Sequence, residues 1–100
     1  MRRGTTPVHS FTLPMDTSTI KKLRVTYAQQ GGTILTKTEE DVVLAGNTVE
    51  LQLTQTETLK FRCTCDVLIE IKILTHAGDA QSSDILRVSV ESCLCEEALE

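Results

Sequence analysis

Alternation of apolar and polar residues with a period of two recurs along this chain, and it constrains the fold more than any other feature of the sequence. The clearest case is "DVLIEIKILT" (66–75), whose apolar phase consists of Val67, Ile69, Ile71 and Ile73. Successive side chains of a β-strand point to opposite faces, so this pattern predicts a strand with one face in the core. The other phase mixes leucine with charged residues, which favours a central place in a sheet.

Similar segments occur on both sides of this strand. We expect strands at 8–13, 20–29, 33–38, 41–44, 48–54, 57–63, 66–75 and 85–92. Further residues expected to point inward are Leu23, Val25, Tyr27, Val49, Leu51, Leu53, Leu59, Phe61, Leu86, Val88 and Val90. Segments rich in Gly, Asn, Asp or Ser separate the strands at 16–19, 29–32, 45–47 and 77–79, and they predict turns or, at 16–19, a short helical cap.

Seven to eight short strands at spacings of roughly 8 to 12 residues predict an all-β fold. We expect an antiparallel two-sheet sandwich, either immunoglobulin-like or jelly-roll-like. It forms one domain over residues 8–92, with a flexible N-terminal arm at 1–7 and an acidic C-terminal tail at 93–100. The tail sequence "CLCEEALE" suggests a short helical or frayed segment.

Composition argues against several classes of partner. The chain has three aromatic residues (Phe11, Tyr27 and Phe61) and a net charge of −4, so a stacking platform or a phosphate-tracking groove for nucleic acid is not expected. No apolar run approaches about eighteen residues, so we expect no membrane span. The start "MRRGTTPVHS" lacks the apolar region of a signal peptide, which predicts a protein made and kept in the bacterial cytoplasm.

Two Cys-x-Cys pairs are the candidate metal ligands: Cys63 with Cys65, and Cys93 with Cys95. Four thiolates can bind zinc, but a single intervening residue on a strand does not match the usual spacing of a zinc site. Disulfides between the pairs are an alternative that a reducing cytoplasm disfavours. We expect free thiols, with Cys63 and Cys65 as small core residues in phase with Phe61, and no metal or other cofactor.

Other polar residues have structural interpretations. His9 and His76 are expected to be solvated, Asp79 and Asp84 to stabilise a turn, and the acidic run 39–41 to form a solvated loop. Lys21, Lys22 and Lys60 are expected to protect edge strands from indiscriminate pairing. No nucleophile, phosphate-binding or metalloprotease motif is present, so an enzyme is not expected, and no catalytic residue is assigned.

Four segments of the chain, "FTLP" (11–14), "VTYAQ" (25–29), "LTQTETLKF" (53–61) and "GDAQSSDILRVSV" (78–90), carry a family resemblance. Across roughly residues 8–99 the sequence resembles a group of small proteins encoded in prophages of Gram-positive anaerobes, near virion structural genes. The resemblance implies a role in the virion or its assembly and assigns no residue a function. Its pattern does not fix Cys63, Cys65 or Cys95.

Three functions follow from these observations. The first is a non-enzymatic phage structural or assembly protein that contacts other phage subunits or copies of itself, forms a homo-oligomer and enters the virion. The second is an immunoglobulin-like binding module for a surface glycan or protein, which would need either a metal bound in a loop or an exposed aromatic strip, to which only Tyr27 could contribute. The third is a zinc- or redox-linked protein that uses the four cysteines.

Overall fold

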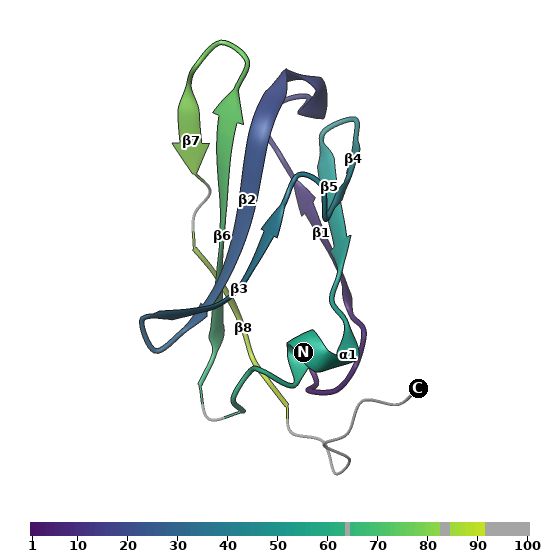
Figure 1. Cartoon of the computed structure of the whole chain (residues 1–100), viewed down its shortest axis with the longest axis vertical. Coiled ribbons are helices and arrows are strands. Elements are labelled where there is room, and N and C mark those ends of the chain that lie inside the picture. The colour runs from purple at the N-terminus through teal and green to yellow at the C-terminus, as the bar shows by residue number, and fades with distance from the viewer. Residues whose placement is uncertain (64, 83–84, 92–100) are drawn as a thin grey trace.

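The computed structural model describes residues 1–63, 65–82 and 85–91. These residues form two antiparallel sheets that lie side by side in Figure 1. The three-stranded sheet has the order β1-β5-β4 and consists of β1 (Val8–Thr12), β4 (Val43–Ala45) and β5 (Thr48–Gln52). The five-stranded sheet has the order β3-β2-β6-β7, with β8 also paired to β6, and consists of β2 (Ile20–Gln29), β3 (Gly32–Thr38), β6 (Val67–Thr75), β7 (Ala80–Ser82) and β8 (Leu86–Val88). The predicted all-β sandwich is confirmed.

The core lies between the two sheets and is built from the phases that the alternation predicted. In the central pair of the larger sheet, Val25 lies opposite Ile71 and Tyr27 opposite Ile69. The buried hydrophobic residues are Leu13, Ile20, Leu23, Val25, Tyr27, Val49, Leu51, Leu53, Phe61, Val67, Ile69, Ile71, Ile73 and Val90. Burial of these side chains is the main force that holds the two sheets together.

The predicted turns are also present. A two-residue loop joins β2 to β3, and both of its residues have positive φ, 50° at Gln30 and 79° at Gly31. Positive φ at both positions matches the right-handed twist of the flanking strands. The segment 16–19 forms a short 3₁₀ helix (Thr17–Thr19), which Asp16 caps by accepting a hydrogen bond from the backbone N–H of Ser18 at 2.9 Å.

The predicted strand at 57–63 is wrong. This region contains the short helix α1 (Gln55–Thr58), followed by a loop that leads to β6. The reason is a capping box: Thr54 Oγ1 accepts from the N–H of Glu57 at 3.1 Å, and Glu57 Oε1 accepts from the N–H of Thr54 at 2.8 Å. The local hydrogen bonds prevail over the short alternation in "LKFR", although Phe61 is still buried.

The segment around β8 follows the prediction only in part. Val90 is buried, Val88 is half-buried, and Leu86 lies on the same inner face because it pairs with the core residue Ile69, but Leu86 is still 42% exposed. β8 is a three-residue strand that pairs with β6 at the margin of the five-stranded sheet, so the inner side of Leu86 is less covered than that of the central strands. Residues 92–100, where the acidic tail and the pair Cys93 and Cys95 were predicted, lie outside the described residues.

The first residues of the chain lie against the end of the described chain. The N–H of Arg3 donates to the carbonyl of Glu91 at 2.9 Å, and the N–H of Glu91 donates to the carbonyl of Met1 at 2.7 Å. The Arg2 guanidinium and the Glu91 carboxylate are 2.8 Å apart. Figure 1 shows this meeting point at the same end of the molecule as α1, far from the β6–β7 hairpin.

Candidate functional site

The outer face of the five-stranded sheet carries the most unusual arrangement of charge in the described chain. Its side chains come from the positions of β2 and β6 that alternate with the core residues. Across these strands Lys22 lies opposite Leu74, Arg24 opposite Lys72, Thr26 opposite Glu70, and Ala28 opposite Leu68. This face was not predicted, because the charges of β2 and β6 meet only once the register of the two strands is known.

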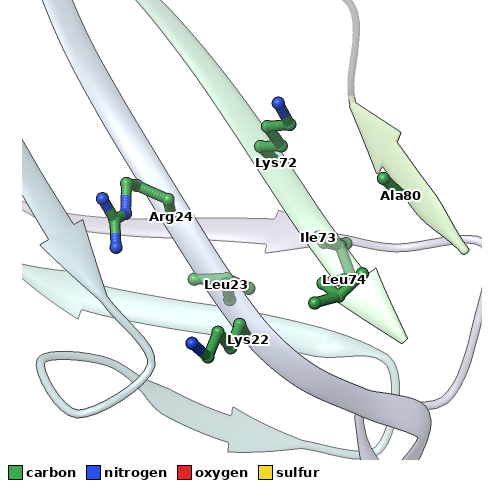
Figure 2. A pocket seen from close by; sticks show the side chains of 7 residues that line it. All are labelled: Lys22, Leu23, Arg24, Lys72, Ile73, Leu74 and Ala80. Carbon is green, nitrogen blue, oxygen red and sulfur yellow. The ribbon is translucent and has the colours of Figure 1, made fainter. Parts of the chain in front are cut away.

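We call Lys22, Arg24 and Lys72 the basic face. Figure 2 shows Lys22 and Arg24 on β2 beside Lys72 and Leu74 on β6, with Ala80 on β7 beyond them. These residues surround an open hollow of about 390 Å³, which is lined by Lys22, Leu23, Arg24, Lys72, Ile73, Leu74 and Ala80. The three cations are exposed, so a partner can reach them directly.

Charge on the basic face works against the stability of the sheet. Arg24 and Lys72 are direct cross-strand neighbours, and like charges in such a position are destabilising. A nearby carboxylate offsets part of this repulsion. Hydrogen bonds from the backbone N–H groups of Glu39 itself and of Leu23, together with the charges of Lys22 and Arg24, hold the pKa of Glu39 below its usual value.

The opposite end of the same face is apolar. Ile85 is 58% exposed and borders a hollow of about 170 Å³, which is lined by Thr26, Ala28, Leu68, Ile69, Glu70 and Ile85. The outer face therefore runs from a cluster of cations, through Thr26 and Glu70, to exposed aliphatic side chains. Mixed apolar and charged surfaces of this kind are typical of protein interfaces.

A second group of polar residues lies inside the sandwich. The ring of His9 on β1 stacks on Tyr27 of β2 with the centroids 5.8 Å apart, and His9 Nδ1 lies 2.7 Å from the Tyr27 hydroxyl oxygen. The prediction that His9 is solvated is wrong, because the histidine is in phase with Phe11 and points toward the core. Near this pair, Lys37 Nζ of β3 and Glu57 Oε2 of α1 form an ion pair at 2.6 Å.

The environment of this group favours a structural role. Burial raises the pKa of Tyr27, and the charge of Glu57 adds to the shift. Burial also lowers the pKa of His9, with a smaller contribution from the N-terminal amino group. Burial alone would raise the pKa of Glu57, but hydrogen bonds from Lys37 and Thr54 lower it. The Tyr27 side chain is 0% exposed, so its hydroxyl joins the sheets and is not open to a substrate.

The first cysteine pair is not part of the core. Cys63 is exposed and Cys65 is half-buried, and both thiols are free. They lie in the loop between α1 and β6, so the period-two phase that predicted burial does not apply to them. The buried side chain of Gln29 holds this loop: its Nε2 donates to the carbonyls of Arg62 at 2.7 Å and Cys65 at 3.0 Å, and its Oε1 accepts from the N–H of Arg62 at 2.8 Å. Gln29 follows Tyr27 in the inward phase of β2, a signal that could have identified it.

Within residues 1–63, 65–82 and 85–91, no three His, Cys, Asp or Glu side chains come together as metal ligands. Cys93 and Cys95 lie outside this part, so the proposed four-cysteine site stays untested. The same part of the chain contains no helix long and apolar enough to cross a membrane.

The acidic run 39–41 mainly binds backbone. Asp41 Oδ2 accepts from the N–H of Thr38 at 3.0 Å and from its hydroxyl at 3.1 Å, while Glu39 Oε2 accepts from the N–H of Leu23 at 3.1 Å. His76 is exposed, as predicted. The N–H of Asp79 donates to the Thr75 hydroxyl at 3.1 Å, whereas Asp84 lies outside the described residues.

Two of the three lysines predicted to protect edge strands do lie beside an open edge. Lys21 and Lys22 belong to the end of β2 that extends past β3, because the pairing of β2 with β3 begins at Arg24. Lys22 also forms part of the basic face, whereas Lys60 is in the loop after α1 and not on a strand.

No protein-family model matches this chain, and no curated protein matches its sequence. The functional interpretation therefore depends on the surface described above and on the resemblance noted in the sequence.

Proposed function

We propose that this chain is a non-enzymatic structural or assembly protein of a phage or prophage, which acts through protein–protein contacts. The observation that carries the proposal is the direct pairing of Arg24 with Lys72 on the outer face of the five-stranded sheet. A cross-strand pair of like charges lowers the stability of the isolated fold. Such an unfavourable pair is expected where the surface is used to bind a partner. The resemblance to prophage-encoded proteins supplies the virion setting, with synthesis in the bacterial cytoplasm.

The other two candidate functions lack a specific observation in their favour. A glycan-binding module would present aromatic side chains, but Tyr27 and Phe61 are buried and Phe11 is half-buried. A zinc or redox protein would join Cys63 and Cys65 to the second cysteine pair, which lies outside the described residues. Elemental analysis of protein purified without chelator tests the zinc hypothesis, which requires close to one equivalent of zinc per chain.

Light scattering coupled to size-exclusion chromatography tests the proposal. The chain is run alone at rising concentration, and again after mixing with the virion proteins encoded beside its gene. We expect a species larger than the 11.0 kDa monomer in at least one of the two arms. A strict monomer in both arms would overturn the proposed function.

A further inference from the structure

We propose that the basic face of one copy binds the acidic C-terminal segment, residues 92–100, of a second copy. This inference rests on the proposed function and names the partner. The segment "SCLCEEALE" contains Glu96, Glu97 and Glu100 and no basic residue. Its charge is thus opposite to that of Lys22, Arg24 and Lys72, and opposite charges across an interface provide both steering and specificity.

The apolar parts of the two surfaces also correspond. Leu74 and Ala80 line the hollow between the cations, so a ligand that fills it must bring aliphatic side chains as well as carboxylates. The acidic segment offers Leu94, Ala98 and Leu99 around its glutamates. A simple polyanion such as a nucleic acid would match the cations and leave this aliphatic surface unmatched.

The position of Glu91 favours binding of the acidic segment to the basic face of a second copy over binding to the basic face of its own chain. Val88 pairs with Val67, and the chain continues from Val88 away from Lys72 to the meeting point with residues 1–3. About eight strand residues at about 3.3 Å each separate the level of Glu91 from that of Lys72, or about 26 Å. Six residues of fully extended chain from Glu91 to Glu97 span at most about 22 Å. Glu96 and Glu97 could therefore meet their own basic face only with the chain fully stretched, and Glu100, nine residues or at most about 32 Å from Glu91, only with it nearly extended. The same glutamates can meet a neighbour's basic face without tension.

Donor and acceptor surfaces at opposite ends of one molecule give a head-to-tail contact. In such a heterologous arrangement each copy uses one surface to hold the next, so the assembly grows into a ring or a filament. Both forms recur in particles built from many copies of one subunit, which fits the proposed structural role.

The test uses two full-length charge-reversed proteins and their combination, studied by sedimentation velocity in reducing buffer. The face variant carries Arg24→Glu and Lys72→Glu, and the tail variant carries Glu96→Lys and Glu97→Lys. We expect each alone to associate at least about tenfold more weakly than the wild type. Mixed together, they should regain association and grow as the wild type does, with the two variants alternating, because the intact face meets the intact tail and the reversed face meets the reversed tail. A chain with all four substitutions should regain self-association.

A matched control reverses two cations outside the hollow, Lys60 and Arg87, by Lys60→Glu and Arg87→Glu. This variant has the same net charge as the face variant, so we expect it to associate like the wild type. Circular dichroism melts of all variants confirm that they fold. Association of the wild type should also weaken as salt rises to about 0.5 M, since exposed charges are then largely screened.

Several outcomes would overturn the inference and leave the proposed function standing. One is a wild type that stays monomeric but binds neighbouring virion proteins. Another is self-association that neither variant weakens, or that the four-substitution chain does not restore. A third is binding of a fluorescent DNA oligonucleotide that the face variant loses while self-association is unchanged. A wild type that is monomeric and binds no virion protein would instead remove the proposed function itself.

Discussion

The hydroxyl oxygen of Tyr27 lies 2.7 Å from Nδ1 of His9, and this hydrogen bond joins the five-stranded sheet to the three-stranded sheet through the core. Either residue can donate, depending on the histidine tautomer. Because the Tyr27 side chain is fully buried, its hydroxyl depends on His9 rather than on solvent for a partner. The bond is a polar contact between the two sheets, with the ion pair of Lys37 and Glu57 nearby, and it leads to two predictions.

Replacement of Tyr27 by phenylalanine keeps the ring in place and removes the hydroxyl. We expect the free energy of unfolding to fall by about 1 kcal/mol, the usual net value of one such bond. Urea denaturation followed by circular dichroism measures the change. His76→Asn serves as the control, because His76 is exposed, and it should leave the midpoint unchanged. A Tyr27→Phe protein as stable as the wild type would show that the bond contributes nothing net.

Stability should fall as the pH is lowered from about 7 to about 5. The folded protein holds the pKa of His9 below the ordinary value of about 6.5, whereas the unfolded chain has the ordinary value. The unfolded state therefore binds a proton first, and the stability present above about pH 6.5 is lost as the pH falls toward the folded pKa. His9→Gln should flatten the dependence in this range. If His9→Gln leaves the slope of stability against pH unchanged, the pH dependence comes from other titrating groups.

The capping box of α1 can be tested with two threonines that are separated by one residue. Thr54→Ala removes the hydroxyl that accepts from the N–H of Glu57, and we expect a loss of about 1 kcal/mol in the free energy of unfolding. Thr56→Ala is the matched control: Thr56 is exposed within the same helix, and its change should stay within about 0.5 kcal/mol. Equal effects of the two substitutions would contradict the capping role.

Removal of the Gln29 amide should release the cysteine loop. Gln29→Leu leaves the N–H of Arg62 and two carbonyls without their partner, so we expect a destabilisation of about 2 kcal/mol. Reaction with a thiol reagent under native conditions gives a second measurement. The exposed thiol of Cys63 should react in the wild type. The thiol of Cys65 should react faster in Gln29→Leu than in the wild type, because it is half-buried only while the loop is held. If Cys65 reacts at the same rate in both proteins, Gln29 does not position the loop.

The like-charged pair on the outer face should limit the stability of the monomer. Lys72→Thr removes the repulsion opposite Arg24 and places a residue with high strand propensity there, so we expect a gain of about 0.5 kcal/mol. Lys60→Thr, in the loop after α1, is the control and should change stability little. Thermal melts at low protein concentration measure both. A stability loss on Lys72→Thr would mean that the lysine supports the fold, and the main support for the proposed interface would then be lost.

The sequence predicted those parts of the fold in which one strong local signal prevails. The period of two places Tyr27, Ile71 and Leu51 in the core without knowledge of strand order, because the phase alone decides which face is buried. It failed at 57–63, where "LKFR" alternates over only four residues and the hydrogen bonds between Thr54 and Glu57 form a helix instead. A capping-box signature was present in the sequence and was the better guide.

The candidate site was harder to predict, because it depends on relations between strands. Arg24 and Lys72 are each ordinary exposed residues on their own strands, and their significance arises from their pairing across the register. The same holds for His9, which is distant from Tyr27 in sequence. Charge pairs and polar contacts between sheets depend on topology, and alternation along one strand does not determine topology.

Gln29 recognises only main-chain atoms in the loop that it holds. These main-chain bonds do not depend on the side chains at 62 and 65, apart from a requirement at 62 for a residue with an N–H group, which excludes proline. Sequence change at Cys63 and Cys65 can alter the chemistry presented at this end of the sandwich while its architecture stays the same. The loop is thus a natural display position, suited to carry a label or a new recognition sequence.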